Sequence, residues 1–165
     1  MIPLVGAVEE LAILSTCNRV EIFAVGDRKS LRPEVLSRWA AARNACVQDL
    51  EPYGDIHEDL EAVRHLFRVA CALDYMVLGE PQILGQLKDS YRTAITAGTT
   101  KVILKRLYHK AFHVSKRVRT ETAVGSAAVS ISYAAAELSK HIFGDLSRQK
   151  AMLIGADEMA ELAAQ

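Results

Sequence analysis

Residues 11–25 read LAILSTCNRVEIFAV, and this stretch decides how the fold begins. The apolar run at 11–14 is typical of a short buried strand, and the alternation over 20–25 is typical of a second strand. The small polar residues between them predict a turn that presents Cys17. Arg19, two residues further on, can lower the pKa of a thiol and so supply thiolate, the form that attacks a carbonyl carbon. The alternative is an ordinary half-buried cysteine beside a structural arginine.

Helical patterns fill most of the remaining chain. Helices are predicted from Pro33 to about Val47, from Glu58, from Ile83 to Ala97, over 101–119 and over 124–142. The first part therefore predicts an α+β fold, with a small sheet covered by helices on one side. A strand at 150–154 and a helix start at 157–164 predict the first strand–turn–helix of a Rossmann-like α/β domain. That strand has no room for a parallel neighbour, so we expect the domain to be truncated here.

Composition and charge suit a globular domain of ordinary size. The chain has 165 residues, half of them hydrophobic, and 20 basic residues balance 20 acidic ones. Residues 90–120 nevertheless carry eight Lys or Arg and no acid, whereas 45–62 carry six acids and no Lys or Arg. Three cysteines without paired spacing argue against a disulfide framework or a zinc site. Neither a signal peptide nor a membrane-length apolar run is visible, which favours a cytoplasmic location.

Four ordered motifs resemble the glutamyl-tRNA reductases. They are STCNRVE at 15–21, HLFRVA at 65–70 with GEPQILGQ at 79–86, KRVRTET at 116–122, and VSIS at 129–132 running on through AAA at 134–136 to IFGDL at 142–146. The family reduces the glutamyl group on its tRNA to glutamate-1-semialdehyde with NADPH, through a cysteine thioester, at the entry to five-carbon tetrapyrrole (porphyrin) synthesis. The resemblance implies a catalytic domain at 1–122, clipped at its N-terminus, a connecting helix at 123–149 and the beginning of an NADPH-binding domain at 150–165.

The resemblance also implies roles for individual residues. Cys17 is the expected nucleophile, and His65 is the expected proton shuttle to the leaving ribose hydroxyl. The expected substrate contacts are Thr16, Asn18, Arg19, Tyr75, Glu80, Pro81, Gln82 and Gln86. For Arg19, whose fork suits a carboxylate, the alternative is an exposed surface arginine. For His65 it is an ordinary helix residue, and for Glu80 and the two glutamines it is helix capping.

Two departures from the family pattern concern substrate and cofactor. The family usually has serine at the positions of Cys71 and Tyr75, so Tyr75 places a larger group where substrate is contacted. The implied cofactor-binding residues are Gly155, Ala156, Asp157, Glu158, Met159 and Ala160. Asp157 stands where the family has a glycine, and its bulk and charge oppose a cofactor phosphate.

The implied partners are glutamyl-tRNA(Glu), the downstream aminomutase, and a second subunit bound through a C-terminal dimerisation domain that the sequence lacks. The stripe Arg106, Lys110, His113 and Arg117 suits tRNA phosphates, or it is simply a solvated helix face. A second function stays open, namely a non-reducing remnant that binds tRNA or a partner, or that hydrolyses glutamyl-tRNA. Continuation of the reading frame into a full nucleotide-binding fold would favour the reductase.

Overall fold

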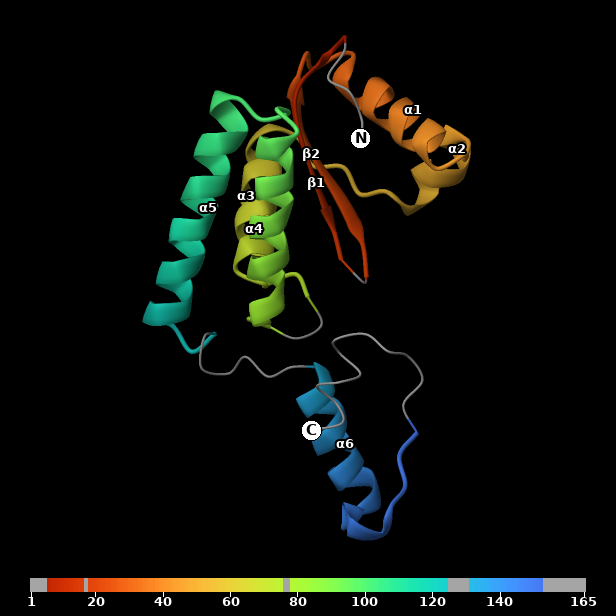
Figure 1. The fold of residues 1–165 in the computed structure, drawn as a ribbon, viewed down its shortest axis with the longest axis vertical. Coiled ribbons are helices and arrows are strands. Elements are labelled where there is room, and N and C mark those ends of the chain that lie inside the picture. Colours follow the sequence, from red (N-terminus) through yellow and green to blue (C-terminus); the bar gives the residue numbers. More distant parts are fainter. Residues whose placement is uncertain (1–5, 17, 76–77, 125–130, 153–165) are drawn as a thin grey trace.

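A computed structural model describes residues 6–16, 18–75, 78–124 and 131–152. Strands β1 (Val8–Ser15) and β2 (Val20–Gly26) form an antiparallel hairpin in which Leu14 pairs with Glu21 and Ala12 with Phe23. Both predicted strands are thus confirmed, and β1 is longer than the apolar run. The remaining elements are helices, so this part of the chain has the predicted α+β fold (Figure 1).

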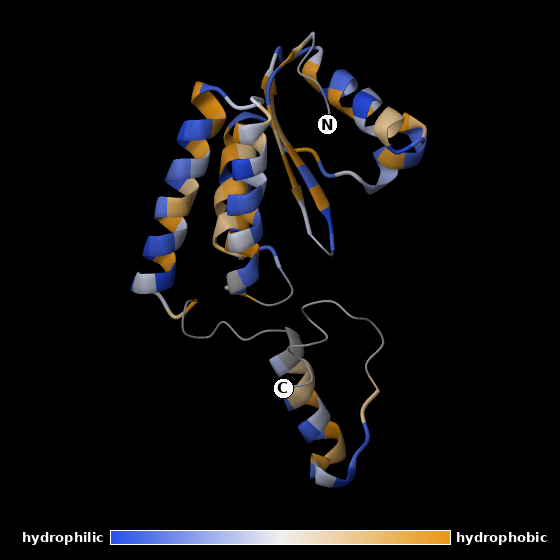
Figure 2. Cartoon of the chain, in the orientation of Figure 1, coloured by the Kyte–Doolittle hydropathy of each residue, from blue (hydrophilic) through white to orange (hydrophobic). Residues whose placement is uncertain are grey.

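Helices α3 (Asp59–Ala70), α4 (Pro81–Thr96) and α5 (Val102–Glu121) pack beside one face of the hairpin. Helix α1 (Leu31–Ala42) contacts both strands from the opposite side (Figure 1), so the prediction of helices on one side was wrong. The short α2 (Val47–Leu50) and a 3₁₀ turn, η1 (Glu51–Tyr53), follow α1. In the hydropathy colours, apolar residues run along the strands that these helices cover (Figure 2).

Three predicted boundaries need correction. The first helix ends at Ala42 rather than near Val47, because Asn44 takes a left-handed conformation, with φ of 52°, that a helix cannot continue through. Helix α4 begins at Pro81 rather than Ile83, since proline is tolerated in a first helical turn. The predicted start of the last helix at Val124 is wrong, because Val124 lies in a turn. The described part of this helix is α6 (Ile131–Phe143), and residues 125–130 lie outside the described residues.

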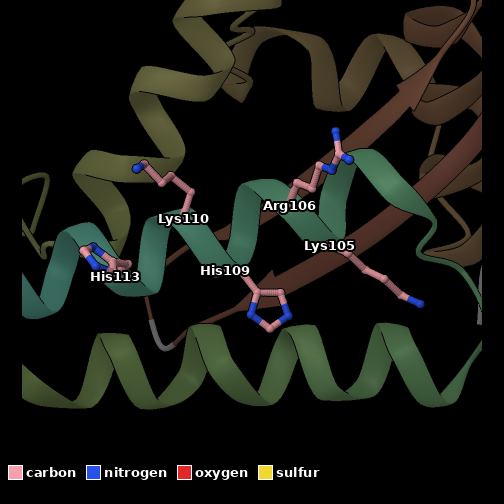
Figure 3. A pocket seen from close by; sticks show the side chains of 5 residues that line it. All are labelled: Lys105, Arg106, His109, Lys110 and His113. Carbon is pink, nitrogen blue, oxygen red and sulfur yellow. The ribbon is translucent and has the colours of Figure 1, made fainter.

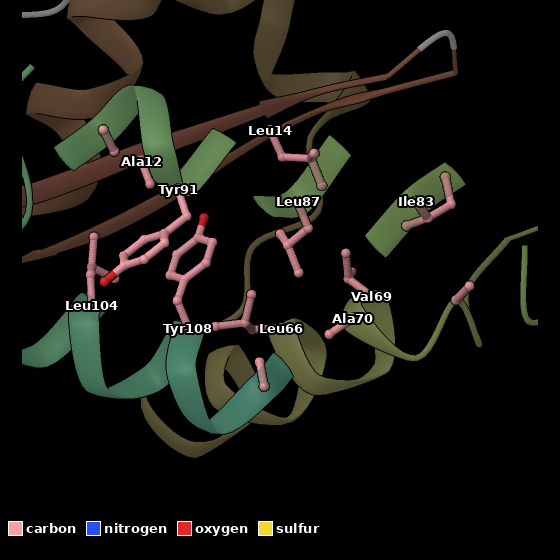
Figure 4. Close-up of a cluster of buried hydrophobic side chains, with 13 residues drawn as sticks. Ala12, Leu14, Leu66, Val69, Ala70, Ile83, Leu87, Tyr91, Leu104 and Tyr108 are labelled. Carbon is pink, nitrogen blue, oxygen red and sulfur yellow. The ribbon is translucent and has the colours of Figure 1, made fainter. Parts of the chain in front are cut away.

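The core lies between the hairpin and helices α3 to α5 (Figure 4). Tyr108 is fully buried, stacks on Tyr91 at 5.0 Å between ring centroids and meets Phe23 edge-on at 5.9 Å. The helices are thereby fixed to the sheet through one aromatic cluster. Edge-to-face and offset contacts of this kind add about 0.5–1.5 kcal/mol each beyond the burial itself.

A buried carboxylate ties β1 to the start of α5. Glu10 is only 3% exposed, and its carboxylate oxygens accept the backbone N–H groups of Lys101, Ile103 and Leu104 at 2.7–2.9 Å. Beside this tie, the hydroxyl of Thr99 donates to the carbonyl of Leu11 at 2.8 Å. A carboxylate at a helix N-terminus satisfies orphan donors and interacts favourably with the helix dipole.

The C-terminal part of the described chain packs differently. Among the described elements, α6 contacts only η2 (Leu146–Arg148), and Leu138, Ile142 and Phe143 on α6 are each more than 60% exposed. Residues 150–152 of the predicted strand have no strand assigned, and 153–165 lie outside the described residues. The predicted Rossmann-like beginning and the three domain boundaries therefore stay predictions.

Candidate active site

The turn between β1 and β2 is organised by Thr16. Its backbone N–H donates to the carbonyl of Arg19 at 2.9 Å, and its Oγ1 accepts from the backbone N–H groups of Asn18 and Arg19 at 3.3 and 3.1 Å. The Thr16 hydroxyl is therefore engaged in the turn itself, while Asn18 is exposed. Cys17, the predicted nucleophile, lies outside the described residues, so its role stays a prediction.

Arg19, Glu21 and His65 form a chain of charged side chains below this turn. Glu21 Oε1 lies 2.8 Å from Arg19 Nε, and Glu21 Oε2 lies 2.9 Å from His65 Nε2. The three side chains are 29%, 12% and 21% exposed respectively, so water screens them only partly. The predicted surface-exposed alternative for Arg19 is not what the structure shows. Glu21 holds the arginine and the histidine together from one strand.

His65 is flanked on both ring nitrogens. Its Nδ1 lies 3.7 Å from Asp74 Oδ2, and the ring of His57 stacks on it at 4.5 Å between centroids. Asp74 in turn accepts from Arg68 Nε at 2.8 Å, and this guanidinium holds the pKa of the Asp74 carboxyl below its usual value. Two carboxylates thus face the imidazole, Glu21 within hydrogen-bond distance and Asp74 slightly beyond it.

Tyr75 forms the wall of the site beside Arg19. The Arg19 guanidinium lies 4.2 Å from the centre of the tyrosine ring, within the range of a cation–π contact. The phenol is half-buried, and burial raises its pKa. The tyrosine is carried by a loop closed by a hydrogen bond from Gly79 N to Ala72 O at 3.0 Å. Gly79 has φ of 76°, and a Cβ there would lie 2.4 Å from the carbonyl of Val124, so only glycine fits.

The other predicted substrate contacts lie at the start of α4. Glu80 is the N-cap residue, 7% exposed, and its side chain makes no capping hydrogen bond. Pro81 occupies the first turn, and Gln82 and Gln86 are half-buried one turn apart. The Oε1 atom of Gln86 is buried without a hydrogen-bond partner among the described residues. The capping alternative is therefore not supported for the Glu80 side chain.

Several buried polar atoms around the turn lack partners within the described chain. They are Arg19 Nε and Nη2, Glu21 Oε1, the Tyr75 hydroxyl and Gln86 Oε1. The Arg19–Glu21 ion pair is short but lacks the alignment of a hydrogen bond, which is why both of its atoms belong to this set. Unsatisfied buried groups are rare in folded proteins and call for an explanation. A bound carboxylate would supply acceptors to Arg19, and bound donors would serve Glu21 and Gln86.

Sequence reasoning missed Glu21, Asp74 and His57 as members of this cluster. The signal for Glu21 was its register, because it pairs with the buried Leu14 and so lies on the core face of β2. The predicted cofactor residues at 155–160 lie outside the described residues. Within the described part of the chain, no group of three His, Cys, Asp or Glu side chains is placed to hold a metal ion, and no helix there is long and apolar enough to span a membrane.

The fold and the sequence both match known proteins. The family model described as "Glutamyl-tRNAGlu reductase, N-terminal domain" matches residues 3–122. A glutamyl-tRNA reductase of Nitratidesulfovibrio vulgaris (strain DP4) is 65% identical over 164 residues, and that of Desulfovibrio desulfuricans is 65% identical over 163. Glutamyl-tRNA reductase from Methanopyrus kandleri has a similar structure, with a TM-score of 0.60 and 36% identity over 95% of this chain.

These matches define an α+β domain of the kind found at the N-terminus of glutamyl-tRNA reductases. The chain belongs to the glutamyl-tRNA reductase family. It spans 37% of the length of the first of these relatives and 36% of the Methanopyrus kandleri chain.

Proposed function

We propose that this chain supplies the substrate-binding, thioester-forming part of a glutamyl-tRNA reductase, an oxidoreductase of tetrapyrrole biosynthesis. The observation that carries the proposal is the partly buried Arg19–Glu21–His65 cluster below the turn, with its unsatisfied polar atoms. The full reaction is the NADPH-dependent reduction of glutamyl-tRNA(Glu) to glutamate-1-semialdehyde. The identity to named relatives supports that reaction.

Cys17 is the proposed nucleophile. Its thiolate attacks the carbonyl carbon of the glutamyl ester, a carbon–sulfur bond forms, and the bond from that carbon to the ribose oxygen breaks. The tRNA leaves with a free hydroxyl once its oxygen gains a proton. This half of the reaction needs no cofactor.

Arg19 is the proposed site for the side-chain carboxylate of the glutamyl group. Its guanidinium is held in place by Glu21 on one side and by the ring of Tyr75 on its face. Its Nη2 is buried and has no hydrogen-bond partner in the described chain. A planar guanidinium fixed in this way is suited to a carboxylate.

His65 is the proposed proton donor to the leaving ribose oxygen. Its Nε2 lies 2.9 Å from Glu21 Oε2 and its Nδ1 lies 3.7 Å from Asp74 Oδ2, so the ring is held with a carboxylate near each nitrogen. An imidazole held in this way can pass a proton to a leaving oxygen. The same contacts give His65 a second task, because through Glu21 it also fixes Arg19. Both tasks predict a loss of thioester formation when His65 is replaced.

NADPH supplies hydride to the thioester in the proposed reaction. The residues assigned to it by resemblance, 155–160, lie outside the described residues, so its place in this chain stays a prediction. The aminomutase partner and the homodimer rest on the resemblance alone, and the cytoplasmic location stays a prediction from the sequence.

Trapping the thioester tests the proposal. Cys46 is exposed and lies just before α2. Cys71 is buried, and this burial raises the pKa of its thiol. We therefore choose the Cys46→Ser chain, incubate it with glutamyl-tRNA without NADPH, quench it in acid and map the adduct by mass spectrometry. We expect glutamyl on Cys17, released by hydroxylamine and absent from a Cys17→Ser control. An adduct on Cys71, or none in a folded sample, contradicts the assignment. Slow release of glutamate without NADPH is expected, because water competes for the thioester.

A further inference from the structure

The outward side of α5 is an uninterrupted row of cationic and titratable side chains. We call it the α5 basic face, and its members are Lys105, Arg106, His109, Lys110, His113 and Lys116, all exposed. The opposite side of the helix carries the buried Leu104, Tyr108 and Ala111. The row contains no acidic residue, and the 11 positions from Lys105 to Lys116 rise by roughly 16 Å.

The cations of the α5 basic face are not paired with acidic side chains of their own helix, unlike cations on the other long helices of the described chain. Helices α1, α3, α4 and α6 each pair a cation with an acid three or four residues away. The pairs are Glu34–Arg38, Glu61–Arg64, Asp89–Arg92 and Glu137–Lys140. On α5 the one ion pair among the described residues is Arg117–Glu121, in the last turns. Like charges four apart, as in Arg106 and Lys110, destabilise a helix, so an external polyanion would relieve this face.

Two hollows border this face, and the second of them reaches α4. The first, of about 450 Å³, is lined by Lys105, Arg106, His109, Lys110 and His113 (Figure 3). The second, of about 620 Å³, shares His113 and adds Lys88 from α4 together with Lys116 and Arg119. The shared histidine makes the two hollows adjacent. No acidic side chain lines either hollow.

The row leads to the candidate active site. Ser115, on the buried side of α5, donates its hydroxyl to the carbonyl of Ala70 at the end of α3, at 2.7 Å. Arg119 Nη1 donates to the carbonyl of Gly79, one residue before Glu80, at 3.0 Å. The end of α5 is thus fastened to the loop that carries Tyr75 and opens α4. The hairpin turn and the C-terminal end of α5 lie toward the same end of this part of the molecule (Figure 1).

We propose that the α5 basic face binds the ribose–phosphate backbone of the tRNA arm that delivers the glutamyl group to the turn. The proposal rests on the function proposed above, and it names the surface where the nucleic acid lies. Cations spaced along a helix suit successive backbone phosphates, and the duplex part of an RNA is bound mainly through phosphates and 2′-hydroxyls. The hollows leave room for that backbone beside α4.

The first test measures the binding of unacylated tRNA(Glu) to the whole chain as a function of salt. The variant Arg106→Gln/Lys110→Gln removes two cations of the face. The matched control Lys29→Gln/Arg43→Gln removes the same two charges from exposed positions on the α1 side. At about 0.1 M salt we expect the variant to bind roughly 10-fold or more weakly, with the slope of log K against log salt smaller by about 1.5. The control should keep the wild-type affinity and slope.

The second test separates this proposal from the function on which it rests. Thioester formation is measured with glutamyl-tRNA and with glutamyl-adenosine, an ester that lacks the phosphate backbone. We divide kcat/KM for glutamyl-tRNA by kcat/KM for glutamyl-adenosine. In Arg106→Gln/Lys110→Gln we expect this ratio to fall roughly 10-fold or more. If neither substrate labels the wild-type chain, the proposed function fails. If both substrates label the wild-type chain and the variant has the wild-type ratio, the proposed function stands and the role of the α5 basic face in tRNA binding is wrong.

Three further outcomes would overturn the proposal. One is an equal loss of tRNA binding in the control variant. Another is tighter binding of vesicles rich in anionic lipid than of tRNA, which would assign the face to a membrane surface. The third is a dimer, detected by sedimentation, that dissociates at high salt and is absent in Arg106→Gln/Lys110→Gln. That result would assign the face to the acid-rich residues 45–62 of a second copy.

Discussion

The two ends of the β-hairpin differ in how their buried charged groups are paired. At the open end, the carboxylate of Glu10 accepts three backbone N–H groups at the start of α5 and the nearby Thr99 hydroxyl is also bonded, although the buried Thr100 hydroxyl has no hydrogen-bond partner among the described residues. At the turn end, Arg19, Glu21 and Tyr75 each have a buried polar atom without a hydrogen-bond partner among the described residues. An unsatisfied buried group costs about 1–3 kcal/mol. The Glu10 tie serves stability, and the charged groups at the turn end are the ones that the proposed function assigns to substrate.

The largest expected effect is at the open end. Glu10→Ala removes three charge-assisted hydrogen bonds and leaves helix N–H groups without an acceptor, so we expect the free energy of unfolding to fall by about 3 kcal/mol. Glu10→Gln, which keeps one acceptor oxygen, should lose roughly half of that. Urea unfolding measures both. The neighbouring Glu9 is exposed, and Glu9→Ala should change stability by less than about 0.5 kcal/mol. Equal losses at Glu9 and Glu10 would remove the contrast between the two ends.

At the turn end we expect loss of chemistry with little loss of stability. Glu21→Gln removes the charge that fixes both Arg19 and His65, and misplacement of such groups costs about 100-fold in rate. Single-turnover formation of the thioester measures this effect, and urea unfolding should show a change within about 1 kcal/mol. The control Glu61→Gln breaks an exposed ion pair with Arg64 and should leave the rate unchanged. A stability loss as large as that of Glu10→Ala would show that the turn end is structural too.

Tyr75 allows a finer division between its ring and its hydroxyl. Tyr75→Leu removes the cation–π contact with Arg19 and should lower stability by about 1 kcal/mol. Tyr75→Phe removes only the hydroxyl, which interacts with Arg19 without the alignment of a full hydrogen bond, so stability should stay within about 0.5 kcal/mol. Unfolding and KM for the glutamyl ester are both measured. A raised KM in Tyr75→Phe alone would show that the hydroxyl itself binds substrate.

The smallest expected effect is on the stability of the protein at low pH. Arg68 lowers the pKa of Asp74 in the folded protein, so this carboxylate contributes stability above its ordinary pKa of 3.8. That contribution is lost as the pH falls below 3.8 toward the lowered value. Asp74→Asn should therefore lower the urea midpoint at pH 7 and narrow the difference between pH 7 and pH 3. Asp89→Asn, at an exposed pair on α4, is the control. An unchanged difference in Asp74→Asn would show that the Arg68 pair contributes nothing.

Much of the fold was predictable because its signals are periodic. An apolar run predicted β1, alternation predicted β2, and helical patterns predicted α3, α4 and α5. The end of α1 was missed although asparagine can end a helix in a left-handed turn, because Asn44 is a weaker signal than the glycine or proline that usually marks one. The position of α1 on the opposite face also escaped prediction, because amphipathicity says that a helix packs but not on which side of the sheet.

Most members of the candidate site were predictable from the sequence, but the contacts between them were not. Arg19, His65, Tyr75 and Gln86 were named from motifs, and the structure places Arg19 against Tyr75 and joins it to His65 through Glu21. Glu21 was missed because a charge in an alternating strand is normally taken as a solvent-facing position. Asp74 was missed because its contact with His65 depends on how the loop after α3 folds back.

The Glu10 tie also sets the order in which the molecule can form. Its acceptor lies near the beginning of the chain, and its last donor, the N–H of Leu104, lies 94 residues later. During synthesis the hairpin therefore leaves the ribosome long before the helix that completes it, and β1 keeps an uncompensated carboxylate until α5 is made. Contacts this distant in sequence slow folding, since the intervening chain must be ordered before they form. The contacts at the open end of the hairpin thus form late in folding, when α3, α4 and the start of α5 are present together.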